Sequence, residues 1–311
     1  GVVSVGSTTN TRQIINVAAG KVSSSSTDAV NGSQLYAAFD AINNLTTSAG
    51  VKYFSVNSTG GNNELNDGAK KPDAIAIGKN SLSNGTSGIA LGLNSSVVSG
   101  NGIDARGGIS VGEVSNAMSK NATARGANAY AMSVNSIAMG ANAVAGGEVT
   151  SVQAFANGTS QWTVFGQNTI AIGNQSNAVF SNAIAIGNKA HAEQGIALGN
   201  GATSLYNGVA IGDGAISTDA QSIAIGGQSQ STGNISVAIG ANSEAKDIQA
   251  VALGFSAIAN NAYTTAVGAD AQALGQNSTA LGTLAEAHGI NDVAVGAMAK
   301  ASGGFATAMG D

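Results

Sequence analysis

The sequence of 311 residues contains little of what builds thick cores and reactive sites. It has no cysteine, one proline, one tryptophan and two histidines, and aromatic residues make up 4 % of it. The lack of cysteine excludes disulfide bridges and thiolate metal sites. Charged residues amount to 9 %, against roughly 25 % in an average soluble domain. No Lys/Arg cluster is present, so we expect neither nucleic acid nor an anionic membrane as a partner.

Long apolar runs are also lacking. No stretch is long enough to span a bilayer, and residues 1–30 lack the charged start and apolar core of a signal peptide. Both ends of the chain resemble copies of the repeated phrase described next, so we expect a segment of a longer protein.

Glycine and alanine are abundant, and they recur periodically. The phrase x-Ala-h-Gly, in which h is apolar, ends at Gly78, Gly92, Gly140, Gly173, Gly187, Gly199, Gly212, Gly226, Gly240, Gly254, Gly268, Gly282, Gly296 and Gly310, and a serine variant ends at Gly112. From Gly212 to Gly310 every interval is fourteen residues. A glycine in each copy excludes a helix, because each would cost about 1 kcal/mol relative to alanine.

Within each period, apolar and small residues alternate, which predicts two short strands. We expect the first strand to face inward with residues such as Val237 and Ile239, and the second to face inward with alanines. Gly240 and Gly254 are predicted to turn the chain at corners. Copies stacked in register would form a mainly β, parallel solenoid of fourteen-residue repeats with some fourteen coils. Two longer intervals predict insertions at about 93–108 and 141–169.

Such a thin coil buries little apolar surface, so the sequence predicts association between chains. The central alanine of each phrase would point away from Val237 and Ile239, and a column of alanines on an outer face would let other copies approach closely. We therefore predict a parallel homo-oligomer with contacts at Ala224, Ala238, Ala252, Ala266 and Ala280.

The first 71 residues do not follow the period. Thr27–Asp28 is an N-cap candidate for a helix in which Leu35, Ala38, Ile42 and Leu45 have coiled-coil spacing. Asn31 would lie one step earlier in the same seam. We expect a short coiled-coil helix at 30–50 and a connector at 51–71.

The residues give little support to a catalytic, phosphate-binding or metal-binding site. His191 and His288 lie about seven coils apart, so no Ser/His/Asp set can form within one chain. Phosphate-binding glycine loops follow a long strand and open a helix, and segments such as Gly100–Gly108 do neither. Calcium-binding repeats need an aspartate at the same position of successive coils, and the aspartates of this sequence share no repeat position. We predict no catalytic residue, cofactor or metal. Trp162, in the longer insertion, is a tentative ligand contact, although anchoring of the insertion is the favoured interpretation.

The x-Ala-h-Gly array over Ile75–Gly310, the segment "TDAVNGSQL" (Thr27–Leu35) and the segment "KYFSVNS" (Lys52–Ser58) together resemble the passenger of a trimeric autotransporter adhesin with a YadA-like head. The resemblance implies a left-handed parallel β-roll packed as a homotrimer. It implies the end of a preceding roll at 1–6, a neck at 7–29 that includes Asp28, and a head at 72–311. It also implies a bacterial cell-surface location and a C-terminal outer-membrane barrel outside this fragment.

The resemblance implies a non-enzymatic role in attachment to collagen, fibronectin, laminin, cells or abiotic surfaces, with autoagglutination or biofilm formation as further outcomes. Variable outward residues such as Glu244 and Lys246, and the insertions, are the places where recognition is expected. One alternative is a purely structural spacer. A left-handed β-helix acyltransferase would need a six-residue sub-period, and an ice-binding solenoid would need a threonine ladder; neither pattern is present.

Overall fold

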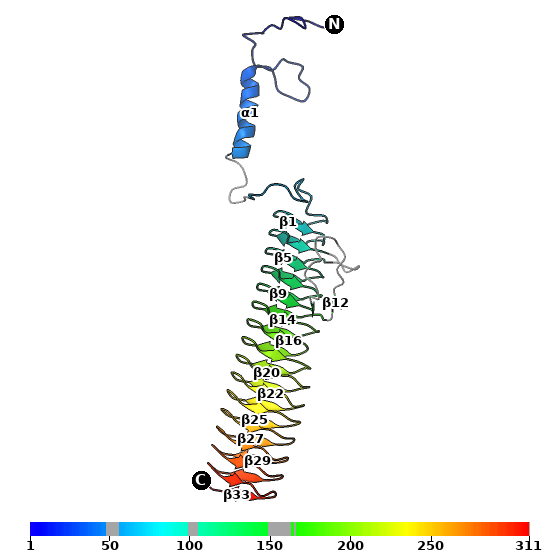
Figure 1. Ribbon diagram of the computed structural model, residues 1–311. Coiled ribbons are helices and arrows are strands. Elements are labelled where there is room, and N and C mark those ends of the chain that lie inside the picture. The colour runs from blue at the N-terminus through cyan, green and yellow to red at the C-terminus, as the bar shows by residue number, and fades with distance from the viewer. Residues whose placement is uncertain (48–55, 99–104, 149–162, 165, 311) are drawn as a thin grey trace. The chain divides into compact units, whose positions relative to one another are not determined.

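A computed structural model describes residues 1–47, 56–98, 105–148, 163–164 and 166–310. The chain divides into two compact units, residues 1–57 and residues 58–311. The first unit contains one helix, α1 (Gly32–Thr47), and the second is built from short strands (Figure 1).

Helix α1 begins where a side chain satisfies one of the free amides of its first turn. The Oδ1 atom of Asn31 accepts hydrogen bonds from the Gln34 backbone N–H at 3.1 Å and from the Ser33 hydroxyl at 2.8 Å. Asn31 is therefore the N-cap. The placing of the N-cap at Thr27–Asp28 is wrong, whereas the place of Asn31 in a seam between chains stays a prediction.

The second unit is a parallel β-solenoid. Each coil contributes one three-residue strand to one long sheet, and nearly every coil contributes a two-residue strand to the other long sheet. Its sixteen-stranded sheet contains β1 (Ile75–Ile77), β3 (Ile89–Leu91), β5 (Ile109–Val111), β7 (Thr123–Arg125), β9 (Ile137–Met139), β13 (Ile170–Ile172), β15 (Ile184–Ile186), β17 (Ile196–Leu198), β19 (Val209–Ile211), β21 (Ile223–Ile225), β23 (Val237–Ile239), β25 (Val251–Leu253), β27 (Thr265–Val267), β29 (Thr279–Leu281), β31 (Val293–Val295) and β33 (Thr307–Met309).

The other long sheet has fifteen strands. It contains β2 (Leu82–Ser83), β4 (Ser96–Val97), β6 (Asn116–Ala117), β8 (Tyr130–Ala131), β10 (Val144–Ala145), β14 (Asn177–Ala178), β16 (His191–Ala192), β18 (Thr203–Ser204), β20 (Ile216–Ser217), β22 (Gln230–Ser231), β24 (Glu244–Ala245), β26 (Ile258–Ala259), β28 (Gln272–Ala273), β30 (Glu286–Ala287) and β32 (Lys300–Ala301). A separate antiparallel pair, β11 (Gly147–Glu148) and β12 (Thr163–Val164), branches from the coil that contains β10.

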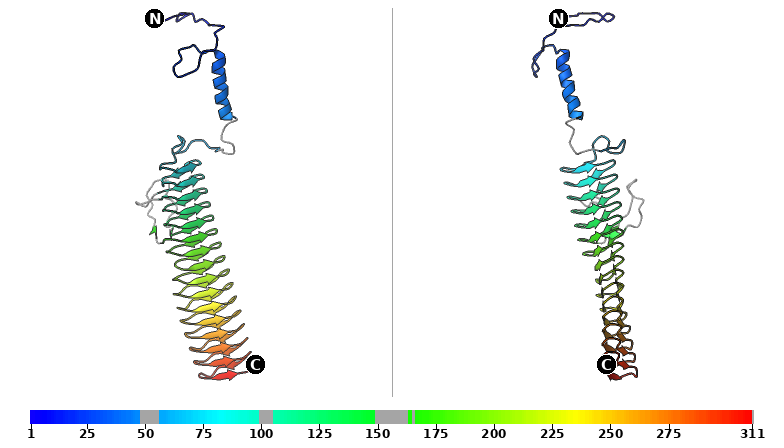
Figure 2. Two further views of the ribbon diagram at one scale, coloured as in Figure 1. Left: turned by 180° about the vertical axis from the view of Figure 1, so that it is seen from behind. Right: turned by 90° about the vertical axis from the view of Figure 1, so that its left-hand side faces the viewer.

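Equivalent residues of successive coils lie directly over one another. Ala238, for example, pairs in parallel register with Ala252, which pairs with Ala266. The two views of Figure 2 show the resulting stack of strands within this unit. At about 4.8 Å per coil the sixteen-stranded sheet extends roughly 70 Å.

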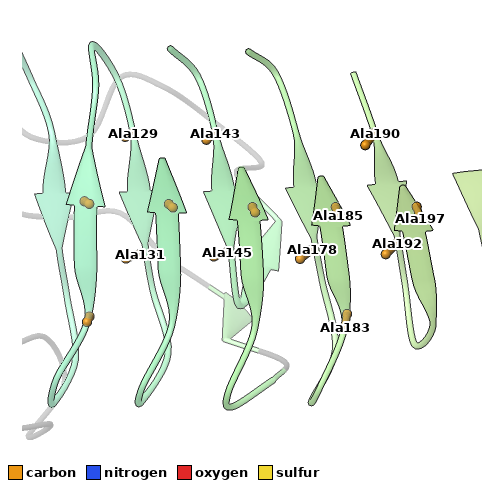
Figure 3. Close-up of a cluster of buried hydrophobic side chains, with 14 of the residues drawn as sticks. Ala129, Ala131, Ala143, Ala145, Ala178, Ala183, Ala185, Ala190, Ala192 and Ala197 are labelled. Atoms are coloured by element: carbon orange, nitrogen blue, oxygen red, sulfur yellow. The ribbon is translucent and has the colours of Figure 1, made fainter. Parts of the chain in front are cut away.

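Alanines of both sheets point into the narrow space between them. Ala238 and Ala252 of the first sheet and Ala245 and Ala259 of the second are completely buried. Figure 3 shows the same arrangement around Ala185, Ala192 and neighbouring alanines. Ile239, by contrast, is 40 % exposed. The predicted orientation of the first strand is therefore inverted.

The outward placement of the larger apolar side chains has a steric cause. The inward residues of both sheets are mostly alanine, with serine at some levels, and hydroxyl groups fill part of the interior: Ser231 Oγ lies 2.6 Å from Ser236 Oγ. Because packed interiors leave no spare volume, a valine side chain in place of Ala238 would have to displace its neighbours. Val97 of β4 is the exception at the interior position that Ala117 occupies in the next coil, and there Gly85, Gly88 and Gly108 lie against it. Apart from Val97, the larger apolar residues of the two sheets are consequently on their outward sides. Ala224, Ala238, Ala252, Ala266 and Ala280, predicted as contacts between chains, all line the interior instead.

Glycine is required where each three-residue strand ends. Gly254 has φ +138°, a backbone conformation that L side chains rarely adopt, and a Cβ atom there would overlap the carbonyl oxygen of Gly268 in the next coil. Gly240 has the same geometry with respect to Gly254. These glycines turn the chain at the predicted corners.

Asparagines at the opposite corner link successive coils through their side chains. Asn121 Nδ2 donates to Asn135 Oδ1 at 3.1 Å, and Asn135 Nδ2 donates to Asn168 Oδ1 at 3.0 Å. The second bond joins coils on either side of the longer insertion. The corner geometry is thus continuous where the sequence is interrupted.

One coil had escaped the sequence pattern. Strand β7 has Arg125 where the phrase requires an apolar residue, yet it pairs in register with β5 and β9. The sheet therefore has sixteen strands rather than some fourteen. The described coil residues also continue on both sides of the two long intervals, whose residues 99–104 and 149–162 lie outside the described residues.

The narrow interior can be tested by adding volume to it. We expect Ala238→Val to lower the free energy of unfolding by about 1–3 kcal/mol or more, because the added methyl groups have no space between the sheets. Ala241→Val is the matched control. Ala241 is exposed in the turn that follows Gly240, so this substitution should change stability little. Denaturant unfolding followed by circular dichroism measures both. Equal stability of the two variants would show that the interior has spare volume.

Candidate interaction surfaces

The outward side chains of the sixteen-stranded sheet form one surface, here called the apolar face. Because Ala points inward at the centre of each strand, the first and third residues point outward. The first residues are Ile75, Ile89, Ile109, Thr123, Ile137, Ile170, Ile184, Ile196, Val209, Ile223, Val237, Val251, Thr265, Thr279, Val293 and Thr307. The third residues are Ile77, Leu91, Val111, Arg125, Met139, Ile172, Ile186, Leu198, Ile211, Ile225, Ile239, Leu253, Val267, Leu281, Val295 and Met309.

Most of these side chains are only partly covered in the single chain. Ile186 is 39 % exposed and Leu281 is 36 % exposed, like Ile239, while Val237 is half-buried by its neighbours in the column. A contiguous apolar surface of this length is unusual on a soluble monomer and typically marks a site of association.

The outward side chains of the fifteen-stranded sheet form a second surface, here called the mixed face. From β16 onward it is largely polar. Lys246 Nζ lies 2.5 Å from Glu244 Oε2, and Lys300 Nζ lies 2.9 Å from Glu286 Oε1. The hydrogen bond from Lys300, together with the nearby His288, holds the pKa of the Glu286 carboxyl below its usual range. Pairs that are open to solvent in this way contribute little to stability, and the two lysines are exposed.

The mixed face is different in the coils before the longer insertion. Met118, Tyr130 and Met132 form a buried cluster there, and Val144 packs against it. Tyr130 is only 3 % exposed although it points away from the interior, and burial raises the pKa of its hydroxyl. Trp162, the predicted ligand contact in the insertion, lies outside the described residues.

Large apolar side chains also lie exposed at the corners of the later coils. They are Tyr206, Ile235, Phe255, Tyr263, Leu284, Ile290, Met298 and Phe305. Several of them adopt positive φ; Ile235, a β-branched residue, has φ 55°. That conformation is costly for such a residue. We infer that the stacking of coils imposes the positive φ, with the side chain left exposed.

In the first unit, Gln34 holds the segment before the helix. Its Oε1 accepts the Gly20 N–H at 2.9 Å and its Nε2 donates to the Gly20 carbonyl at 2.6 Å. Asp28 Oδ2 accepts the Lys21 N–H at 2.8 Å, and Asn31 Nδ2 donates to the Val17 carbonyl at 3.1 Å. Asp28 and Asn31 were predicted members of this segment. Gln34 was missed, because nothing in the helical pattern distinguishes it.

The coiled-coil candidates Leu35 and Ile42 lie on helix α1 and are exposed in the single chain. Leu45 is also on the helix, but its side chain is outside the described residues. An apolar seam left open to water on a helix of sixteen residues is typical of a partner-dependent bundle.

Histidine, aspartate and glutamate side chains are dispersed through the described part of the chain. No group of three or more His, Asp or Glu residues there is placed to hold a metal ion. His191 and His288 lie on β16 and directly after β30, seven coil intervals apart along the sheet order, as predicted. Among the described residues, no helix has both the length and the apolar character needed to cross a bilayer.

These features define a class: a repetitive β-solenoid with an apolar side face, accompanied by a short amphipathic helix with a structured lead-in. Two family models match the chain. The coiled stalk of trimeric autotransporter adhesin matches residues 13–71. The YadA head domain repeat matches residues 69–95, 133–148, 166–190, 206–229, 231–257, 259–285 and 287–311, more than half of the chain. The chain belongs to the trimeric autotransporter adhesins with a YadA-like head. A comparison with curated proteins returned no match.

The double hydrogen bond of Gln34 gives a test of the segment before the helix. Gln34→Glu keeps the acceptor for Gly20 N–H but replaces the donor to its carbonyl with a second oxygen. We expect a local loss of about 1–3 kcal/mol, measured as faster hydrogen exchange of the Gly20 amide. Ala37→Glu, which adds the same charge at an exposed helical position, should leave that exchange rate unchanged. Equal exchange in both variants would contradict a holding role for Gln34.

Proposed function

We propose that this chain is the non-enzymatic head segment of a bacterial surface adhesin, and that three copies pack in parallel through their apolar faces. The observation that carries the proposal is the long surface of partly exposed Val, Ile and Leu side chains on one side of the solenoid. Trimerisation, which the family name states, would remove these residues from water. The proposed contacts are thus Val237, Ile239 and their equivalents, and the alanines behind them support the sheet.

We also propose that the domains follow the predicted order. Residues 1–6 would end a preceding roll, residues 7–29 would form a neck, and residues 30–50 would form a coiled-coil helix. A connector at 51–71 would lead into a head at 72–311. The location proposed from the family is the bacterial cell surface, with anchoring in the outer membrane by a part of the protein outside this sequence.

The trimer interface can be tested with one substitution on each sheet. Ile239→Asp places three carboxylates among apolar side chains at one level of the proposed interface. We expect it to destabilise the trimer by about 3–5 kcal/mol, seen as a lower denaturant midpoint for dissociation in light scattering. Ile258→Asp, on the mixed face, is the matched control and should leave assembly unchanged. A folded monomer of the unchanged chain at micromolar concentration would refute the proposal.

Attachment is the proposed role of the trimer, with extracellular matrix proteins such as collagen, fibronectin and laminin, cells, or abiotic surfaces as targets. The apolar face would be occupied by other copies, which leaves the mixed face, the corners and the insertions for a ligand. Lys246 on the mixed face and Phe255 and Tyr263 at the corners are exposed examples, and Glu244 beside Lys246 is partly exposed. A spacer role in a longer fibre is the alternative, since a solenoid of this length also extends whatever it carries.

Removal of the longer insertion separates these two roles. Deleting residues 147–165 leaves fourteen residues between Gly140 and Gly173, which is the regular interval, so the trimer should assemble normally. We expect adhesion of the immobilised trimer to a panel of matrix proteins to fall at least severalfold, with Trp162→Ala as the point variant. Bare plastic serves as the non-specific surface. Unchanged adhesion by both variants would exclude the insertion as the ligand site.

A further inference from the structure

A uniform apolar face does not by itself fix how far one chain lies along another. Each coil presents nearly the same side chains as the next, and the coils are about 4.8 Å apart. If one copy moved along its neighbours by one coil, isoleucine and valine would again meet isoleucine and valine, and only the contacts of a single end coil would be lost. Something else must define the axial position of the copies.

One coil breaks the uniformity. Strand β7 has Thr123 and Arg125 at its two outward positions, whereas the same columns are apolar in the preceding and following coils. Arg125 is exposed and lies between Val111 and Met139 in its column. It is the single charged residue among the outward positions of the sixteen-stranded sheet in the described chain. A guanidinium group in an apolar interface needs a counter-charge.

A carboxylate is available beside this position. Glu113 lies at the corner that follows β5, two residues beyond Val111, which is the partner of Arg125 in the ladder. Glu113 is exposed at the edge of the apolar face. Across the described residues, neither side chain takes part in a hydrogen bond or ion pair within its own chain. Both charges are therefore free to pair with another copy.

We propose that Arg125 sets the axial register of the assembled copies by pairing with Glu113 of a neighbouring copy. This inference rests on the proposed trimer. In the correct register each guanidinium meets a carboxylate at the rim of the interface. After a displacement of one coil it would lie against the isoleucine, valine or methionine of an adjacent level. A single polar residue in an apolar seam sets register in coiled coils by the same physical principle, at some cost in stability.

Charge reversal tests whether the two residues act between copies. We expect Arg125→Glu and Glu113→Arg each to lower the association constant of the full chain at least about tenfold, and the double variant to recover most of the loss. Circular dichroism establishes that each variant keeps its strands. Moving both charges by one coil, with Met139→Arg and Ala127→Glu in an Arg125→Met, Glu113→Ala background, should also assemble, because the offset between the charges is retained.

Cross-linking gives a readout that does not depend on stability. In Arg125→Lys, a carbodiimide should join Lys at position 125 to Glu113 across two chains, giving covalent dimers and trimers on a denaturing gel and the joined peptide in mass spectra. Met139→Lys, one coil further along the column, is the control and should not link to Glu113. A trimer without the 125–113 link, and with no recovery in the double variant, would overturn the register role and leave trimerisation intact. A monomer would instead refute the proposed function.

Discussion

The narrow space between the two long sheets is the constraint on which the rest of the molecule depends. Completely buried alanines such as Ala238 and Ala245 face each other across it, and serine hydroxyl groups occupy the remaining volume. A Cβ atom at Gly240 or Gly254 would overlap the backbone of the next coil. With the interior filled by methyl groups and backbone, the larger apolar side chains have only the outside available.

This displacement links the interior to assembly. Alanine burial contributes far less hydrophobic free energy than burial of isoleucine or leucine, and ordering each residue costs about 1–2 kcal/mol of backbone entropy. The contribution missing inside the chain is present on its surface as the apolar face. Association of copies supplies the burial that an ordinary domain achieves alone. The same reasoning applies to helix α1, whose Leu35 and Ile42 are exposed in the single chain.

Much of this architecture could be predicted from the sequence. The fourteen-residue period, the two strands per coil and the glycine corners follow from the spacing of small residues alone. The direction of the first strand could not be read from hydrophobicity, because valine ranks above alanine on that scale while the interior selects by volume. The informative signal was the repetition itself: the central position is alanine in every coil except that of Ser110, and the flanking positions vary between Ile, Val, Thr, Leu, Met and Arg. Strand β7 was missed because the phrase x-Ala-h-Gly requires an apolar residue where this strand has Arg125. That position points outward, so the core places no such requirement on it.

Constraint and variation are therefore separated within each coil. Interior alanines and corner glycines are fixed by contact with the coils before and after, whereas the outward positions of the mixed face from β16 onward are partly open to water. A change from Glu244 to Ile258 between successive coils alters the surface without disturbing the ladder, since the backbones pair in the same register. Even the corners tolerate diversity: asparagine, tyrosine and isoleucine all adopt positive φ there because the stack imposes the conformation. Outward residues can thus be substituted coil by coil while the interior and the glycine corners stay constant. Such a molecule can change its ligands without changing its fold.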